Sequence, residues 1–340
     1  MAYRYLGNKA RISDWIADVV SNTLPKNAKI ADPMCGTATM SEAFAHRGMK
    51  VVASDELRFP VLHAKARLLH NRRYNFSKVA LSYVDAIEKL NKLKPVKGFF
   101  WSEYSDEGTP TNGVKPRKYF TGTNAAHIDA IRAMIKKWRK AGLSDAASDL
   151  LLHDLILAVN DIANITGTYG YYRSTWNKSS LQPLQLKPSE PIRYPVRHSI
   201  LHGKVEETAS KFKVDGCYLD PPYTKRQYGG NYHILETIAQ EDEPIPAGEG
   251  GLRDWYPQSS NYCYKRHVRG AFHETMKQLD SNWVFISYSE DGHIPPDELL
   301  ELLSEYGNVE RLETPIDRFR SNNGGGKHRL VHEHLYVVET

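Results

Sequence analysis

The fold class of this 340-residue chain is decided by the stretch Ala28-Lys29-Ile30-Ala31-Asp32-Pro33-Met34-Cys35-Gly36-Thr37. Residues 28–31 are an apolar run typical of a short buried strand, and residues 33–37 form a turn that contains Gly36. Residues 40–47 then follow a helical pattern, and residues 49–54 indicate the next strand, which ends at Asp55 and Glu56. Strand, turn, helix and strand make a βαβ unit, which predicts an α/β protein with a doubly wound sheet.

The same βαβ unit predicts a site for a cofactor that contains a nucleoside. A glycine turn after the first strand lets a nucleoside approach the backbone, and an acid at the end of the second strand can bind ribose hydroxyls. The dinucleotide fingerprint has three glycines here, whereas this chain has only Gly36. A cofactor without phosphates is therefore favoured, and a nicotinamide oxidoreductase is a poor alternative. Alone, the pattern is more typical of a structural turn, so the assignment depends on a second motif.

That second motif is Asp220-Pro221-Pro222-Tyr223, which directly follows an apolar strand at residues 216–219. The two prolines fix the backbone and leave carbonyl oxygens as acceptors. An exocyclic amine could donate one hydrogen to the Asp220 carboxylate and one to the Pro221 carbonyl, which localises the nitrogen lone pair for attack on an electrophilic methyl group. Tyr223 would stack on the ring, as in enzymes that extrude a base. The alternative is a strand end with a turn and a surface tyrosine.

Composition sets broad limits on the class of protein. Lys and Arg exceed Asp and Glu by 45 − 40 = +5, which permits a polyanionic partner without requiring one. The three widely spaced cysteines (Cys35, Cys217 and Cys263) support neither a disulfide framework nor a zinc site, so we expect no metal. The chain has no apolar signal core near its start and no later stretch that could span a bilayer. We therefore expect a cytoplasmic protein with reduced thiols and no membrane partner.

Three segments, in this order, resemble the DNA adenine methylase family: Tyr5-Leu6-Gly7-Asn8-Lys9, residues 32–39 and residues 220–223. Residues 117–120, 163–169, 231–237 and 286–289 are also similar to segments of that family, so the resemblance runs through most of the chain. It implies a doubly wound mixed sheet of the S-adenosylmethionine-dependent methyltransferase type. It also implies methyl transfer from S-adenosylmethionine to the N6 amino group of adenine in a specific double-stranded DNA sequence, by base flipping.

The resemblance further implies roles for individual residues. The implied catalytic residues are Asp220, Pro221, Pro222 and Tyr223. The implied cofactor-binding residues are Tyr5, Gly7, Lys9, Asp32, Pro33, Cys35, Gly36, Thr37, Asp55 and Glu56. Two positions depart from the family pattern. Ala38 stands where a second glycine is frequent, so we expect a different turn. Residues 202–205 lack the acid with which many members contact the cofactor adenine, and that contact stays unassigned.

The segment 94–195 is predicted to be a target-recognition insertion within a catalytic domain formed by residues 1–93 and 196–340. It interrupts the sheet, and between residues 92 and 140 it carries eleven Lys and Arg against four Asp and Glu. The polar stretch 240–268 is a second candidate. The residues expected to contact DNA are Arg117, Lys118, Tyr169, Tyr171, Arg173, Arg226, Tyr228 and Asn231. A solvated helix face and an aromatic cluster under a loop are the structural alternatives.

Two further functions stay open at this point. One keeps the transferase and changes the acceptor to cytosine N4 or an RNA base. The other is a non-catalytic DNA-binding subunit, against which the intact Asp220, Tyr223 and Asp55 argue. Double-stranded DNA is the expected partner. The resemblance leaves open a cognate restriction endonuclease as a second partner, and the target sequence is not predicted.

Overall fold

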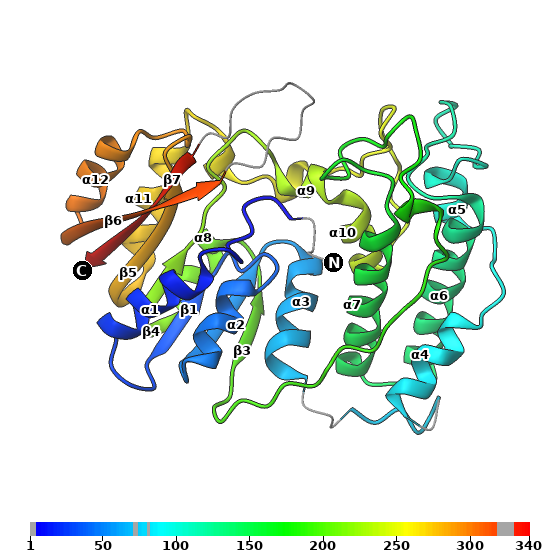
Figure 1. The fold of residues 1–340 in the computed structure, drawn as a ribbon, viewed down its shortest axis with the longest axis horizontal. Coiled ribbons are helices and arrows are strands. Elements are labelled where there is room, and N and C mark those ends of the chain that lie inside the picture. Colours follow the sequence, from blue (N-terminus) through cyan, green and yellow to red (C-terminus); the bar gives the residue numbers. More distant parts are fainter. Residues whose placement is uncertain (1–4, 71–73, 80–81, 318–329) are drawn as a thin grey trace. The chain divides into compact units, whose positions relative to one another are not determined.

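The computed structural model describes residues 5–70, 74–79, 82–317 and 330–340. The chain folds into two compact units (Figure 1). Unit 1 consists of Met1–Leu6, Lys65–Arg193 and Tyr228–Pro257, and unit 2 consists of Gly7–Ala64, Tyr194–Gln227 and Gln258–Thr340. Because each unit is made of three segments, the chain passes from one unit to the other five times.

Unit 2 contains a seven-stranded sheet with the order β3-β2-β1-β4-β5-β7-β6. The strands are β1 (Lys29–Asp32), β2 (Lys50–Asp55), β3 (Ser199–His202), β4 (Lys213–Leu219), β5 (Asp280–Ser289), β6 (Asn308–Asp317) and β7 (Leu330–Glu339). β1 to β5 are parallel to one another, and β7 runs antiparallel between β5 and β6. The predicted doubly wound mixed sheet is confirmed, and its strand order reverses between β1 and β4.

Helices of unit 2 cover both faces of this sheet. Successive residues of a strand point to opposite faces, so Cys217 of β4 packs among residues of α8, α11 and α12. On the other face, the Tyr218 ring meets Phe44 of α2 edge to face at 5.5 Å between centroids. A Cβ atom on Gly216 would lie 2.8 Å from the end of the Leu24 side chain, which follows α1, so a larger residue at this strand position would have to displace Leu24. The helices are α1 (Ser13–Thr23), α2 (Thr39–His46), α8 (Val205–Thr208), α11 (Val268–Gln278) and α12 (Pro296–Ser304).

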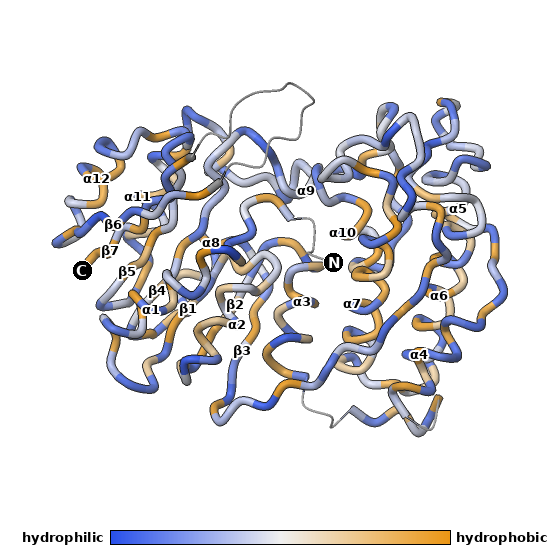
Figure 2. The backbone as a smooth tube through the Cα atoms, viewed as in Figure 1, coloured by the Kyte–Doolittle hydropathy of each residue, from blue (hydrophilic) through white to orange (hydrophobic). Residues whose placement is uncertain are grey.

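Unit 1 is mainly helical, and α3 (Arg58–Leu69) leads into it. Its own helices are α4 (Tyr83–Asn91), α5 (Phe99–Tyr104), α6 (Gly122–Lys140), α7 (Asp145–Ile162), α9 (Tyr228–Asn231) and α10 (His233–Gln240). Thr121 and Ser144 cap α6 and α7 through their hydroxyl groups. Hydrophobic residues follow most of α7 (Figure 2), which is buried on nearly every side. No helix within the described ranges is both long and apolar enough to cross a bilayer.

The two units divide the chain differently from the predicted domains. Residues 65–93, expected in the catalytic domain, belong to unit 1, and so do residues 228–257. The two candidate recognition segments, 94–195 and 240–268, therefore lie largely in the same unit. The physical reason is hydrogen bonding, since the backbone of residues 248–251 accepts hydrogen bonds from side chains in the stretch 104–119.

Candidate active site

The two predicted motifs meet at the carboxyl ends of neighbouring strands in unit 2. Asp32 is the last residue of β1, and Asp220 directly follows β4, which pairs with β1. This is the point where the strand order reverses, and open α/β sheets bind ligands there. The pKa of Asp32 is raised to about 7, mainly by burial; a hydrogen bond from Ser41 acts to lower the pKa, and the negative charge of Asp220 contributes to raising it. The two carboxyl groups are therefore electrostatically coupled.

The turn after β1 is tied to the end of β2 by a carboxylate. Asp55 Oδ2 accepts a hydrogen bond from Gly36 N at 3.0 Å, and its Oδ1 accepts one from Leu57 N at 2.9 Å. Gly36 has φ of 50°, and Ala38 has φ of 59°. Ala38 therefore adopts the left-handed conformation in which a glycine is less strained, at a cost of about 1–2 kcal/mol. The turn thus adopts the left-handed backbone conformation that favours glycine, although Ala38 stands in place of the second glycine.

Basic side chains, His202 and Lys204, lie at and just after the end of β3, where many members of the resembled family carry an acid. His202 stands beside Asp55 in the parallel register, and its Nε2 lies 2.9 Å from the carbonyl oxygen of Glu56. Lys204 Nζ lies 3.5 Å from Glu56 Oε1. Burial raises the pKa of Glu56 to about 7, with Lys204 acting in the opposite direction. Glu56 is therefore the acid that this chain places next to the end of β3.

Asp220 does not stand alone at the end of β4. Lys9 Nζ lies 2.8 Å from Asp220 Oδ1 and 3.0 Å from Glu333 Oε1, so one ammonium group bridges two carboxylates. Burial alone would lower the pKa of Lys9, but the two carboxylates hold it well above its usual range. The pKa of Asp220 is raised to about 6. Burial is the main cause, the charge of Lys9 acts to lower the pKa, and the charge of Glu333 contributes to raising it. The Asp220 side chain keeps 19% of its surface exposed, so a ligand can reach it.

Tyr223 lies partly exposed beside this group. Its ring meets Tyr288 edge to face at 5.9 Å between centroids, and Lys9 Nζ is 5.5 Å from the ring centroid. His293 N donates a hydrogen bond to the Tyr223 carbonyl at 3.0 Å, which fixes the backbone after the two prolines. The motif thus presents a carboxylate and an aromatic ring held by neighbouring elements of unit 2.

The model of the family described as D12 class N6 adenine-specific DNA methyltransferase matches residues 5–298. The chain belongs to this family. The methyltransferase is 27% identical to the type II methyltransferase M.NlaIII of Neisseria lactamica, over 98% of each chain. It is 31% identical to the type II methyltransferase M.FokI of Planomicrobium okeanokoites over 99% of its own length but 52% of the relative's, so it spans about half of that protein.

Family membership decides between the functions that the sequence left open. The methyltransferase modifies the N6 position of adenine in DNA, as predicted, and the cytosine, RNA and non-catalytic alternatives are not supported. A further relative, the type II methyltransferase M.CviAII of Paramecium bursaria Chlorella virus 1, is 27% identical over 98% of this chain and 97% of its own. The resemblance seen in the sequence is therefore confirmed along nearly the whole chain.

The N-terminal motif of the methyltransferase is shared between the two units, because the chain passes from unit 1 to unit 2 after Leu6. In unit 1, the Tyr5 ring stacks on Tyr232 at 4.9 Å between centroids and is tilted against Tyr228 at 5.4 Å. Leu6 N donates to Tyr232 Oη, and Tyr228 Oη donates to the Leu6 carbonyl. In unit 2, Gly7 is followed by Lys9, whose ammonium group binds Asp220. Lys9 was predicted to bind cofactor, and its pairing with Asp220 was not foreseen.

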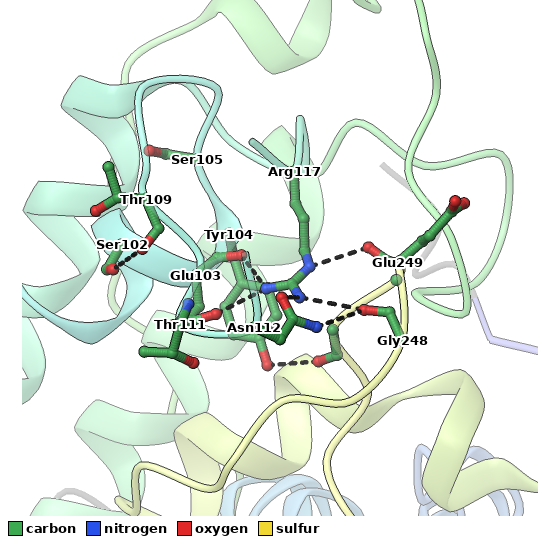
Figure 3. Close-up of polar contacts among 12 residues, drawn as sticks. Ser102, Glu103, Tyr104, Ser105, Thr109, Thr111, Asn112, Arg117, Gly248 and Glu249 are labelled. Carbon is green, nitrogen blue, oxygen red and sulfur yellow. Dashed lines mark hydrogen bonds and ion pairs between the residues drawn. The ribbon is translucent and has the colours of Figure 1, made fainter. Parts of the chain in front are cut away.

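Arg117 was predicted to contact DNA, and its position in unit 1 contradicts this. Its side chain is fully buried, forms an ion pair with the buried Glu103 at 2.7 Å and donates a second hydrogen bond to the Glu103 carbonyl (Figure 3). The remaining donors reach Asn112 Oδ1 and the carbonyls of Gly248 and Glu249. A guanidinium with every donor direction used inside the protein holds two loops together and does not bind phosphate.

Tyr169 is a second correction to the predicted DNA contacts. It is fully buried, and its Oη donates to Asn160 Oδ1 at 3.2 Å. Its backbone N binds the Asn231 carbonyl, and its own carbonyl accepts from Tyr119 Oη. Tyr169 is thus part of the core of unit 1. Tyr171 is 49% exposed, and the other expected DNA contacts are partly or fully exposed: Lys118, Arg173, Tyr228 and Asn231 in unit 1, and Arg226 in unit 2.

Proposed function

We propose that the methyltransferase binds an adenine swung out of double-stranded DNA at the end of β4. The observation that carries this proposal is the partly exposed Asp220 carboxylate at the point where the sheet order reverses. Asp220 and the Pro221 carbonyl accept the two N6 hydrogens, and Tyr223 stacks on the purine. This arrangement draws the nitrogen lone pair out of the ring and orients it, which is the main task in a transfer to an activated methyl group.

The turn after β1 and the ends of β2 and β3 are proposed to hold S-adenosylmethionine. When bound, the cofactor supplies a methyl group on a positively charged sulfur. The residues present fit such a group, since the Gly36 turn is closed by Asp55 and needs no room for phosphates. Asp55 ends the second strand of the βαβ unit, the position from which an acid binds ribose hydroxyls in this class of fold. Glu56 is proposed to contact the cofactor beside it.

Unit 1 is proposed to supply the contacts that recognise the DNA target. Among the predicted contacts, Lys118, Tyr171 and Arg173 keep exposed surface in this unit, whereas Arg117 and Tyr169 do not. Named relatives are type II methyltransferases. By extension we propose that this enzyme works in the cytoplasm beside a cognate restriction endonuclease that reads the same sequence.

Base flipping is tested with 2-aminopurine in place of the target adenine. Sequencing that detects modified bases in DNA from cells expressing the chain first identifies the target site. A duplex carrying 2-aminopurine at that position is expected to brighten when the methyltransferase binds, because the base leaves the stack. The same probe one base pair away serves as the control. Equal fluorescence at the two positions would contradict base flipping.

An Asp55→Ala variant is expected to bind S-adenosylmethionine roughly 10 to 100 times more weakly. Loss of hydrogen bonds to a charged acceptor accounts for this range. The variant also removes the link between Gly36 N and the end of β2. Isothermal titration calorimetry measures the affinity, and Asp14→Ala is the control, since Asp14 is an exposed carboxylate on α1 whose partner is Arg47. Unchanged cofactor affinity in Asp55→Ala would remove Asp55 from the proposed site.

A further inference from the structure

Glu333 is a buried carboxylate for which neither the sequence motifs nor the catalytic proposal has a use. It lies on β7, and its side chain keeps 6% of its surface exposed. Its Oε1 binds Lys9 Nζ at 3.0 Å and accepts a hydrogen bond from Ser287 Oγ of β5 at 2.9 Å. Lys9 in turn binds Asp220. All four residues belong to unit 2, so the group is formed within a single compact part of the chain.

The net charge of Lys9, Asp220 and Glu333 together matters more for methyl transfer than any one contact among them. One lysine and one carboxylate would form a neutral pair, and a neutral pair gives little stabilisation to a cation. With Glu333 present, two carboxylates face one ammonium, and the ionised group carries a net charge of −1. Adenine N6 gains positive charge as it gains a methyl group. Fixed charges of opposite sign, held where that charge develops, lower the barrier.

Glu333 also determines where Lys9 can go. An ammonium group has three donors on a flexible stem, and alone with Asp220 it could cover the carboxylate oxygens that the adenine amino group needs. Glu333, itself held by Ser287, takes one of the three donors. A further donor direction lies toward the Gly7 carbonyl at 3.5 Å. Lys9 is therefore held between fixed acceptors, and only part of its hydrogen-bonding capacity is directed at Asp220.

We propose that Glu333 is a positioning residue for methyl transfer, which anchors Lys9 and supplies the net negative charge beside Asp220. The proposal rests on the proposed role of Asp220 as acceptor of the adenine amino group. Glu333 acts through Lys9 and is not itself in contact with the base.

Glu333 is expected to affect the pH dependence of kcat through the pKa of Asp220. The charged and titratable groups that act on Asp220, Lys9 and Tyr223 are Lys9 and Asp220 themselves, Glu333, Asp32, Tyr218, Tyr223 and Asp291. Asp220 accepts hydrogen bonds much more strongly when it is ionised, and only the ionised form supplies negative charge, so activity falls as the pH falls through its pKa. Because Glu333 raises that pKa, removing its charge lowers the pKa. The acidic limb of the kcat profile then moves to lower pH.

The test compares Glu333→Gln with Glu313→Gln, whose exposed carboxylate on neighbouring β6 faces His334. Glu333→Gln is expected to lower kcat roughly 10 to 100 times and to shift the acidic limb to lower pH, with KM for DNA and cofactor affinity unchanged. Glu313→Gln is expected to behave as the wild type. Ser287→Ala, which removes only the hydroxyl group that holds Glu333, is expected to give a smaller loss of kcat.

The outcomes separate this inference from the catalytic proposal. An unchanged kcat, or a lower kcat with an unmoved acidic limb, would overturn the role of Glu333. If Glu333→Gln does not fold, Glu333→Asp and Ser287→Ala carry the test: Glu333→Asp keeps the charge and is expected to keep the acidic limb in place. Failure of the catalytic proposal would give a different result: Asp220→Ala would then stay active.

Discussion

An Asp220→Ala variant is expected to lose methyl transfer by about a hundredfold to a thousandfold, the size of effect seen when one charge-stabilising group is removed from an active site. The fold is expected to survive, because Lys9 keeps Glu333 as a partner at 3.0 Å. S-adenosylmethionine binding is expected to change little, since its proposed contacts lie at the ends of β1, β2 and β3.

Transfer of a radiolabelled methyl group to target DNA measures the rate, and calorimetry measures cofactor binding. Asp280→Ala is the matched control, because Asp280 is an exposed carboxylate at the opposite end of β5, the strand next to β4. Wild-type turnover by Asp220→Ala would end the catalytic assignment. Loss of turnover together with loss of cofactor binding would show that Asp220 acts through the cofactor site instead.

An Arg117→Met variant is expected to destabilise unit 1 by about 3–5 kcal/mol, the usual cost of removing one partner of a buried ion pair. The Glu103 carboxyl group would lose its guanidinium partner in an environment where its side chain is 1% exposed. The carbonyls of Gly248 and Glu249 would also lose their donor. Urea unfolding followed by tryptophan fluorescence measures this loss.

Lys118→Met is the control for Arg117, since Lys118 is the next residue and is partly exposed. It is expected to change stability by less than about 0.5 kcal/mol and to weaken DNA binding in a salt-dependent way. Arg117→Met with wild-type stability and a reduced salt dependence of DNA binding would restore Arg117 as a phosphate contact.

The sequence predicted strands that are buried on both faces, and it missed two edge strands. β1, β2 and β4 are largely apolar runs covered by helices on both sides, and each was recognised. β3 is a four-residue edge strand without a buried residue, and β6 is an edge strand that carries several charges and Pro315. Edge strands lose the hydrophobic pattern because one side faces water, and a proline is tolerated there.

The position of the candidate active site follows from the same strands. Asp32 and Asp220 were singled out as site residues because each acid directly follows a recognisable strand in the sequence. The partnership of Lys9 with Asp220 depends on which strands become neighbours, and short-range patterns do not contain that information. The sequence around Glu333 contains one indication of its burial, since Glu333 shares a face of its strand with the hydrophobic Leu335. An acid in an apolar strand does not, however, show which residue it pairs with. Arg117 was misassigned because a basic residue in a loop is usually exposed.

The five passages of the chain between its units limit how the proposed recognition unit can be exchanged between relatives. A graft of unit 1 from a relative must replace residues 1–6, 65–193 and 228–257 together. Arg117 from the second piece binds carbonyls of the third, and Tyr5 from the first piece stacks on Tyr232 of the third. Transplanting the second or third piece alone leaves a buried cation facing a foreign loop. Chimaeras in which all three pieces come from the same relative are the ones that should express as folded enzymes.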